Sequence, residues 1–330
     1  MNQSSNREIV RKCYLEFLNR EPDPEGWDHY TKLMEENTLD VKLLTDIFKN
    51  SDEYQKTKKY EDFTKKQKFI FQGKYDIYYN IHPNSVLDNI IVTRGIYDDF
   101  LIRLLSKLIP TDSTSFDIGA NAGFLSLPFA KILSPKGTVH CFEPDLEIFS
   151  FLLENIKINN LTNIVCNSFA LQNNHKLKKI ILNKRRAIHD DGRKNTGLST
   201  IEPNPTYVIG AESVSCSTVD NYVKENSIKQ VDLLKIDVEG GDSKVLFGSA
   251  KTIEHFSPII IYEFSPEIDH LIGISNTRRC FDFLNSKGYV QYQITNDETI
   301  NQLSDYDGIM GESNILCIPN TIKLETIIYV

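Results

Sequence analysis

Four carboxylate residues fall at or near the ends of successive apolar segments that the sequence predicts as β-strands. They are Asp117 in SFDIG, Glu143 in TVHCFEP, Asp237 in VDLLKIDVEG and Glu263 in PIIIYEF. Helical segments lie between most of these strands, so we expect a mainly parallel sheet covered on both faces. Because ligands of open α/β sheets bind at the carboxyl edge of the strands, we expect these four acids to line one crevice.

The turn after the first of these strands has the composition of a site for a nucleotide-like ligand. In DIGANAG, Gly119 and Gly123 permit close approach by a ligand, and the helix that follows presents free amide groups. The spacing is Gly-x-x-x-Gly, whereas dinucleotide sites place a pyrophosphate against Gly-x-Gly-x-x-Gly. A pyrophosphate is therefore not required. Glu143 follows about twenty residues later, where a carboxylate can accept both hydroxyls of a ribose.

The segment LLKIDVEGG carries three charges, and on a strand Lys235, Asp237 and Glu239 would share one face. Burial of unpaired charges costs several kcal/mol, so these groups must pair, reach a solvated crevice or hold a cation. One interpretation is structural, with a Lys235–Asp237 pair that only satisfies itself. The other makes Asp237 a carboxylate that faces the cofactor or the acceptor, with Lys235 or Glu239 assisting proton transfer.

The elements that position these residues fall into two domains. Residues 1–62 are charged and helical in period, which predicts a small all-α module. Residues 63–330 form the α/β domain, with a predicted hairpin within its lead-in, residues 68–92, and an insertion over residues 176–216. Long polar loops often contact substrate, so we expect the loop 189–206, which contains the sequence TGLST, to line the acceptor site.

The order of these segments resembles that of the FkbM-type methyltransferases. The segments are FDIGANAGFLSLPFA, CFEPD, NSFAL, STVDNYV, VDLLKIDVEGGDSKVLFGS and PIIIYEF. The most specific part is IDVEG followed by a helix that ends in Leu-x-Gly, and the resemblance covers roughly residues 90–295. It implies a Rossmann-like class I methyltransferase sheet with an antiparallel last strand, which GYVQYQIT and SNILCIP could supply. It also implies S-adenosylmethionine as cofactor and O-methylation of a hydroxyl on a sugar, surface polysaccharide, glycolipid or polyketide.

This resemblance also assigns roles to residues of the chain. It places Asp117, Gly119 and Gly123 around the methionine part of the cofactor, Glu143 at the ribose, and Ser168, Phe169 and Ala170 at the adenine. Tyr97 and Asp98 match a Tyr-Glu pair of the family, with Asp where Glu is usual. The expected cofactor-binding set is Asp117, Gly119, Asn121, Gly123, Glu143, Pro144, Ser168, Ala170, Asp237 and Tyr97. Asp237 is the first candidate for the catalytic base or orienting group, followed by Glu239, Lys235 and Glu263.

Neither a metal nor a disulfide is predicted. Paired carboxylates are able to bind Mg²⁺, but a site made of oxygen ligands cannot be deduced from spacing. The seven histidines show no ligand spacing, and His140 is interpreted as a core residue of a strand. The six cysteines are scattered, which favours buried, reduced thiols in a cytoplasmic protein.

Charge and hydropathy argue against a nucleic-acid partner, export and a membrane span. The formal net charge is −8, which opposes a nucleic-acid backbone, and we interpret the short lysine-rich stretches as solvated faces. The first residues lack the pattern of an export signal, and no apolar stretch is long enough to span a membrane. The expected partner is a small-molecule or glycan acceptor, and the oligomeric state stays open.

The helical module resembles a bacterial domain of unknown function, through the segment from Arg20 to Tyr30 with its Pro-Asp-Pro-x-Gly, and through Ser51-Asp-Glu-Tyr54. Such modules occur beside glycosyltransferases and surface proteins, which favours a carbohydrate context and leaves docking of a partner open. Two alternatives to a methyltransferase remain. A nicotinamide-dependent oxidoreductase would share the sheet and Glu143 but should show Gly-x-Gly-x-x-Gly. A non-catalytic binding protein would keep the fold without affinity for the cofactor.

Overall fold

The computed structural model divides the chain into two compact units, residues 1–67 and 68–330. The sequence places this boundary at residue 62. The residues that the structure describes are 3–18, 22, 24–36, 38–51, 68–82, 85–174, 176–185, 187–188, 194–195, 197–202, 208–266, 269–270, 275–295, 297–309 and 311–322. Arg20 and residues 52–54, which carry part of the resemblance of the helical module, lie outside them.

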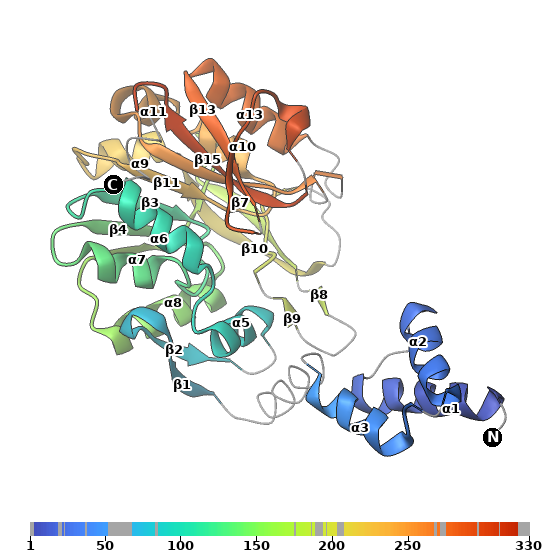
Figure 1. Cartoon of the computed structure of the whole chain (residues 1–330). Coiled ribbons are helices and arrows are strands. Elements are labelled where there is room, and N and C mark those ends of the chain that lie inside the picture. The colour runs from blue at the N-terminus through green and yellow to red at the C-terminus, as the bar shows by residue number, and fades with distance from the viewer. Residues whose placement is uncertain are drawn as a thin grey trace. The chain divides into compact units, whose positions relative to one another are not determined.

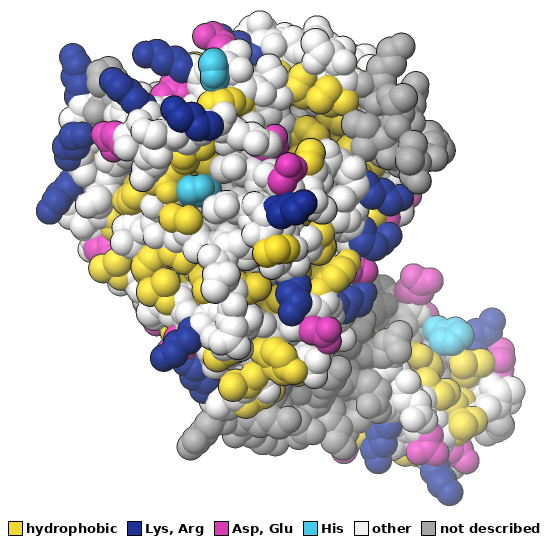
Figure 2. Space-filling view, turned by 90° about the vertical axis from the view of Figure 1, so that its left-hand side faces the viewer, with side chains coloured by type: hydrophobic (Ala, Val, Ile, Leu, Met, Phe, Trp, Pro, Cys, Tyr) yellow, Lys and Arg dark blue, Asp and Glu magenta, His cyan; other side chains and the backbone are white. Residues whose placement is uncertain are grey.

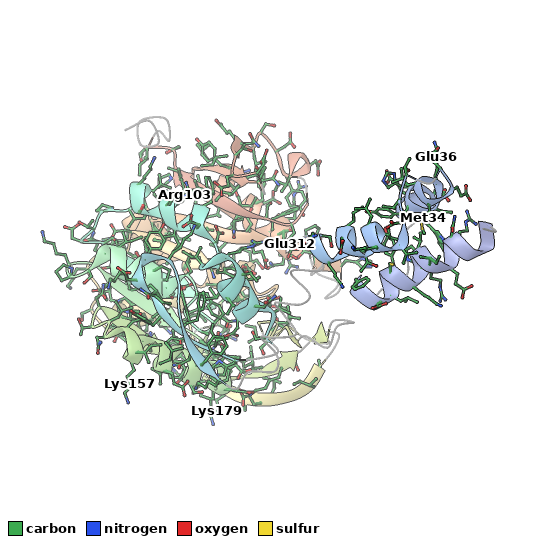
Figure 3. All side chains as sticks on the ribbon, turned by 60° about the horizontal axis from the view of Figure 1, so that its bottom comes forward. Met34, Glu36, Arg103, Lys157, Lys179 and Glu312 are labelled. Carbon is green, nitrogen blue, oxygen red and sulfur yellow. The ribbon has the colours of Figure 1, made fainter. Side chains whose placement is uncertain are left out.

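The first unit is helical. Its elements are α1 (Gln3–Cys13), a π-helical turn (Tyr14–Leu18), α2 (Pro24–Glu35) and α3 (Val41–Asn50). Apolar residues from these elements, including Tyr14, Leu44 and Phe48, form one buried cluster. Met34 lies among the helices, whereas Glu36 points away from them (Figure 3). An amphipathic stripe on each helix therefore supplies the core of this unit.

In the described part of the second unit, eight strands form one sheet. From edge to edge they are β14 (Ile300–Gln302), β13 (Tyr289–Ile294), β15 (Ser313–Pro319), β12 (Ile259–Phe264), β11 (Leu233–Ile236), β3 (Thr114–Ile118), β4 (Thr138–Phe142) and β5 (Ile164–Asn167). The strands from β5 to β12 are parallel to one another. β15 is antiparallel to both of its neighbours, β12 and β13. The predicted Rossmann-like sheet with an antiparallel last strand is confirmed.

Helices cover both faces of this sheet (Figure 1). One face packs against α6 (Asp99–Leu108), α7 (Ser126–Leu133) and α8 (Leu146–Asn159). The other packs against α9 (Val219–Glu225), α10 (Asp242–Phe247), α11 (Ala250–Phe256) and α13 (Asn276–Ser286). Side chains alternate between the two cores, as in β11, where Leu233 enters the first core and Leu234 and Ile236 enter the second.

Three smaller groups of strands occur outside this sheet in the described part of the chain. β1 (Phe69–Gln72) and β2 (Tyr78–Ile81) form an antiparallel pair around a 3-10 turn (Lys74–Asp76), and α5 (Val86–Arg94) follows. In the region 176–216, β7 (Lys179–Arg185) pairs antiparallel with β10 (Val208–Ser217), which also pairs with β6 (Ala170–Leu171). A two-residue pair, β8 (Ala187–Ile188) with β9 (Lys194–Asn195), lies between β7 and β10 in the chain.

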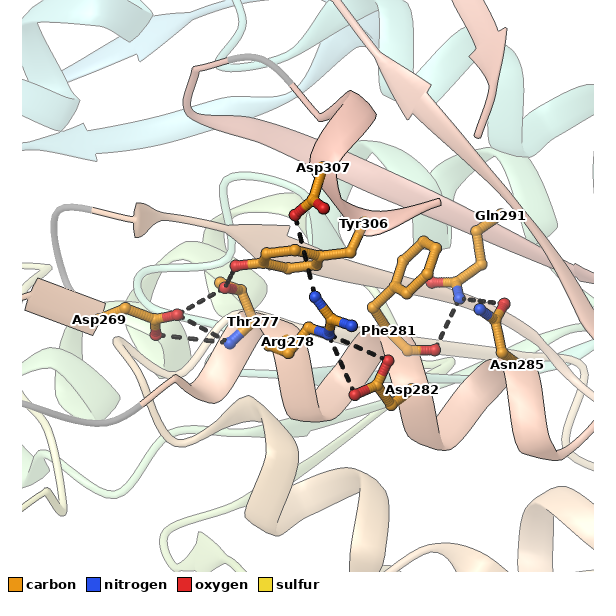
Figure 4. Close-up of polar contacts among 9 residues, drawn as sticks. All are labelled: Asp269, Thr277, Arg278, Phe281, Asp282, Asn285, Gln291, Tyr306 and Asp307. Carbon is orange, nitrogen blue, oxygen red and sulfur yellow. Dashed lines mark hydrogen bonds and ion pairs between the residues drawn. The ribbon is translucent and has the colours of Figure 1, made fainter. Parts of the chain in front are cut away.

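The segment that leads into β15 is held by α13 (Figure 4). Asp269 accepts hydrogen bonds from the backbone amide and the hydroxyl of Thr277, and this hydroxyl lies 2.8 Å from that of Tyr306. The guanidinium of Arg278 lies over the ring of Tyr306, 4.9 Å from its centre. Tyr306 begins a short 3-10 turn that ends at Gly308, shortly before β15. These contacts hold the 3-10 turn that precedes β15 against α13.

The surface shown in Figure 2 carries Lys and Arg side chains with Asp and Glu among them, and apolar side chains between. No described helix is long and apolar enough to cross a bilayer. All six cysteines are unpaired; Cys166 is half-buried and the others are buried. The expectation that nucleic acid is not a partner stays a prediction.

The two glycines of the first turn are required by packing within the protein. Gly119 has φ +84°, and a Cβ atom there would lie 1.8 Å from the carbonyl oxygen of Asp237. Gly123 has φ +86°, and its Cβ would crowd the side chains of Leu152 and Leu127. Our expectation from the sequence was that a ligand approaches the backbone at these glycines. That expectation stays a prediction, and the structure adds a second requirement, because the turn after β3 closes against the end of β11 and against helices α7 and α8.

We therefore expect Gly119→Ala to destabilise the protein severely, by at least about 3 kcal/mol, because left-handed strain adds to a backbone clash. Gly210→Ala is the matched control, since no atom lies within 4 Å of its Cβ position, and its unfolding free energy should change by no more than about 0.5 kcal/mol. Urea unfolding of both variants measures the difference. Equal stability of the two would contradict the packing described here.

Candidate cofactor and acceptor site

A cavity of about 450 Å³ opens at the carboxyl edge of the sheet. All four strand-end acids, Asp117, Glu143, Asp237 and Glu263, line it as expected. Of the other residues expected from the sequence, the cavity wall contains Tyr97, Gly119, Asn121, Pro144, Ala170, Lys235 and Glu239. Gly123 and Ser168 are not part of the described wall. The cavity is within the size range of pockets that hold small molecules and cofactors.

Lys235 lies at the centre of the charged wall and is only 8% exposed. Its Nζ is 3.4 Å from Oδ1 of Asp117 and 3.1 Å from Oδ2 of Asp237. Burial opposes the positive charge, but Asp237 and Asp117 outweigh it and raise the pKa of Lys235. The lysine is therefore a permanent cation that orients two carboxylates. It does not fit the role of a proton acceptor, which our sequence analysis left open for it.

Glu239 lies beyond the strand, which corrects the expectation that it shares a strand face with Lys235 and Asp237. β11 ends at Ile236. The backbone then turns toward α10, with φ +55° at Glu239 and +93° at Gly240. Residues with a left-handed backbone conformation end the strand, so side chains beyond them no longer alternate between its two faces. Glu239 nevertheless lines the cavity, and its carbonyl oxygen accepts a hydrogen bond of 2.8 Å from the hydroxyl of Thr200.

Glu143 follows β4 and is 7% exposed. Its Oε2 accepts a hydrogen bond of 3.0 Å from the amide of Asn121, and its Oε1 accepts one of 2.9 Å from the amide of Asp145. Burial raises the pKa of Glu143 to about 7, although these amides favour the charged form. Each carboxylate oxygen has two lone pairs and uses one of them here, so both oxygens can still accept a hydrogen bond from a hydroxyl. This geometry suits the two hydroxyls of a ribose.

An apolar part of the wall adjoins Glu143. Phe169 lines the cavity and packs edge-on against Phe142, with ring centres 5.6 Å apart. Ile148 and Leu182 line the same cavity. An aromatic face with aliphatic neighbours is the environment that a planar heterocyclic base prefers. Of the segment Ser168 to Ala170, Phe169 and Ala170 therefore offer the surface for an adenine.

The insertion reaches the cavity through residues 197–201. Gly197, Leu198, Ser199 and Ile201 belong to the wall. Asp145 holds this segment, because it accepts hydrogen bonds of 3.1 Å from Nζ of Lys184 and 3.2 Å from Oγ of Ser199. Thr196 and most of the remaining loop 189–206 lie outside the described residues. Our sequence analysis did not assign a role to Asp145, although its place in CFEPD, before a helix, is typical of an N-cap.

The opposite end of the cavity is strongly acidic. Burial and the charges of Asp237 and Glu239 raise the pKa of Glu263 well above its ordinary value. Tyr97 lines this end, and burial of its hydroxyl together with the charge of Asp237 raises the pKa of that hydroxyl. Asp98, which caps α6, lines the cavity as well. Buried like charges of this density mark a functional site more often than a structural one.

Glu312 and Asn314 also line this end, and our sequence analysis missed both. Asn314 pairs with Glu263 across the sheet. Because β15 runs antiparallel to β12, its first residues lie beside the carboxyl end of β12. The predicted antiparallel last strand was the signal that could have located them.

No metal centre is formed by the described residues, among which no three His, Cys, Asp or Glu side chains are placed to hold an ion. His140 lies 2.8 Å from the hydroxyl of Tyr222 and packs against Phe116. Burial lowers the pKa of His140 to about 4, so it is neutral at physiological pH. It is a core residue, in agreement with the interpretation from the sequence.

The strand order and the carboxyl-edge cavity define a Rossmann-like protein of the class I methyltransferase type. A family model described as the methyltransferase FkbM domain matches residues 117–290, and the chain belongs to this family. Residues 1–58 match a domain of unknown function, DUF4214. The family decides against the nicotinamide-dependent oxidoreductase that the sequence left open.

Curated relatives are distant. A "Methyltransferase 1" of Beauveria bassiana is 25% identical over 42% of this chain and 59% of its own length. The "Hexuronic acid methyltransferase AglP" of Haloferax volcanii is 25% identical over 49% of this chain and 60% of its own length. The chain thus spans about three fifths of the relatives it matches.

Solved structures with a similar fold include TYW2 of M. jannaschii in complex with AdoMet, which is 14% identical, covers 77% of this chain and 85% of its own, and has a TM-score of 0.35. A SAM-dependent methyltransferase from Aquifex aeolicus is 12% identical, with coverages of 67% and 89% and a TM-score of 0.36. At similarities this low, the details of the site come from this chain alone.

S-adenosylmethionine is the cofactor of this family, and the cavity fits it. Glu143 would hold the ribose hydroxyls, and Phe169 with Ala170 would border the adenine. The carboxylates of Asp117 and Asp237 would face the cationic part of the molecule. Oδ1 of Asp117 is buried and has the ion pair with Lys235 but no hydrogen bond from a described residue. A buried acceptor of this kind is satisfied by a ligand that donates a hydrogen bond.

The pKa of Glu143 predicts that cofactor binding depends on pH. Ribose hydroxyls donate to the charged carboxylate and lower its pKa, so binding is strong above the pKa of about 7 in the ligand-free protein and weakens as the pH falls through it. We expect the dissociation constant of 5′-methylthioadenosine, measured by calorimetry, to rise about tenfold from pH 8 to pH 6.

This probe carries the ribose hydroxyls but no group that titrates in this range. Glu143→Gln serves as the control, because its amide has no charge to lose. The dissociation constant of 5′-methylthioadenosine for this variant should be higher than for the wild type and should not change with pH. An equal pH dependence in the wild type and in Glu143→Gln would remove Glu143 from the cofactor site.

Proposed function

We propose that this chain is an S-adenosylmethionine-dependent O-methyltransferase that acts on a hydroxyl of a sugar, in a surface polysaccharide or a glycolipid. The FkbM family supports methyl transfer. A sugar acceptor is supported by the similarity to a protein named for hexuronic acid methylation. The acidic end of the cavity, opposite the ribose carboxylate Glu143, is the place for the acceptor.

The observation that carries the proposal is the position of Asp237. Its carboxylate lines the cavity and is held by Nζ of Lys235 at 3.1 Å. S-adenosylmethionine supplies a methyl group already activated on sulfur, so the protein has mainly to align the acceptor hydroxyl and to remove its proton. Asp237 orients the hydroxyl and accepts that proton, while Lys235 keeps the carboxylate in place.

Glu263 and Glu239 are the second candidates for the proton acceptor. The raised pKa of Glu263 brings it closer to neutral pH, where a general base works best. Glu263 is therefore able to take the proton onward from Asp237. Lys235, which remains charged, positions Asp237 and takes no proton.

The setting of the reaction is part of the proposal. We place it in the cytoplasm, which keeps cysteines reduced, and this agrees with the unpaired thiols of the chain. The acceptor is a small molecule or glycan and not a nucleic acid. For the helical unit, residues 1–67, docking of a partner remains part of the proposal, and its carbohydrate context rests on the resemblance alone.

Asp237→Asn tests the proposed role. The amide keeps the size of the carboxylate but cannot accept a proton, so we expect methyl transfer to fall at least about a hundredfold. Affinity for S-adenosylmethionine should stay within several-fold of the wild type. The assay measures S-adenosylhomocysteine formed with the first acceptor found in a screen of glycosides.

Glu225→Gln is the matched control, because Glu225 is an exposed acid at the end of α9 and is not part of the cavity wall. It should retain wild-type turnover. Unchanged turnover in Asp237→Asn would refute the role of Asp237. Wild-type protein that binds the cofactor but methylates no glycoside would refute the proposed substrate class.

A further inference from the structure

We infer that the acceptor end of the cavity selects a substrate that carries a protonated amine beside the hydroxyl to be methylated, and that it rejects a substrate with a carboxylate there. This inference rests on the proposed function and specifies the acceptor of the same site. A hydroxyl of an amino sugar has the required chemistry.

The charges of the wall carry the inference. Five carboxyl groups border the acceptor end: Asp98, Asp237, Glu239, Glu263 and Glu312. They come from separate parts of the chain: the start of α6, the turn after β11, the strand β12 and the residue before β15. Among the described residues of the wall, Lys235 is the one basic side chain, and no arginine or histidine occurs.

Lys235 is not available to a substrate. Its Nζ lies between Asp117 and Asp237, at 3.4 Å and 3.1 Å, and the side chain is almost completely buried. One ammonium group already serves two carboxylates, so it cannot also neutralise a carboxylate of the acceptor. A carboxylate in this part of the cavity would find no cation in the described wall.

The positive charge of the bound cofactor does not cancel the net negative charge of this wall. Its net charge of about one positive unit, added to that of Lys235, offsets Asp117 and Asp237 at most. Asp98, Glu239 and Glu312 remain. Burial and the charges of Asp237, Glu239 and Glu312 raise the pKa of Glu263, so Glu263 carries less than a full negative charge. An ammonium group on the acceptor would relieve that repulsion, and charges interact more strongly in a half-closed cavity than at an open surface.

This preference separates the chain from one of its relatives. The protein from Haloferax volcanii is named for a hexuronic acid, which carries a carboxylate, but it is only 25% identical to this chain. Specificity is a difference between two affinities, and unpaired like charges reduce the affinity for the wrong substrate. The expected order of acceptors is therefore amino sugar, then neutral sugar, then uronic acid.

The experiment compares three probes on one ring: the methyl glycosides of glucosamine, glucose and glucuronic acid. Binding of each to the full chain saturated with S-adenosylhomocysteine is measured by ligand-observed NMR. We expect the glucosaminide to bind at least about tenfold more tightly than the glucuronide, with a difference that shrinks between 0.05 M and 0.5 M salt. Equal binding, a preference for the glucuronide, or no detectable binding of the glucosaminide would overturn the inference.

A charge-reversal variant tests whether the acidic wall of the cavity causes the preference for the glucosaminide. Glu312 is exposed at the cavity rim, so Glu312→Lys should tolerate the change and reduce the glucosaminide-to-glucuronide ratio at least about fivefold. Glu225→Lys makes the same change of net charge outside the wall and should leave the ratio unchanged. A ratio that both variants alter equally would attribute the preference to net charge and not to the cavity.

Failure of this inference can be told from failure of the proposed function. Titration with S-adenosylhomocysteine precedes the probes, and a protein that does not bind it is not the proposed methyltransferase. A protein that binds it and prefers the glucuronide remains a methyltransferase of a different acceptor class.

Discussion

A buried ammonium group between two carboxylates is the constraint on which the rest of the site depends. Lys235 pairs with Asp117 across adjacent strands, so the register of β3 and β11 brings their charges together. The carboxylate of Asp237 is the second partner of the Lys235 ammonium group. Removal of either acid would leave a buried cation incompletely paired, which proteins tolerate poorly. The turn after β3 and the turn after β11 are thus held to one another, and Gly119 allows their backbones to meet.

Much of this site was predictable, because strand periodicity and the edge rule of parallel sheets are local signals. They predict that Asp117, Glu143, Asp237 and Glu263 line one crevice, and all four line the cavity. The error at Glu239 arose because alternation was extended past Ile236, although the two glycines that follow Glu239 indicate a turn. The packing that also requires glycine in the first turn was not predictable, because a sequence does not show which chain segment crosses nearby.

The residues that were missed depend on tertiary structure. Glu312 and Asn314 reach the cavity because β15 inserts between β12 and β13 in the opposite direction. Asp145 acts through Lys184 and Ser199, which are distant in the sequence. The raised pKa of Glu263 likewise follows from acids brought together by folding. No rule of sequence spacing predicts such contacts, because each of them depends on how distant parts of the chain come together in the fold.

The placement of the acceptor wall along the chain has an evolutionary consequence. The family segment covers residues 117–290, whereas Tyr97 and Asp98 precede it and Glu312 and Asn314 follow it. In the proposed function, the groups that hold the cofactor lie mostly within the family segment, whereas the acceptor end combines acids of that segment with residues of both flanks. Under that proposal, substitutions in the flanks would change the acceptor wall and leave the cofactor turn intact.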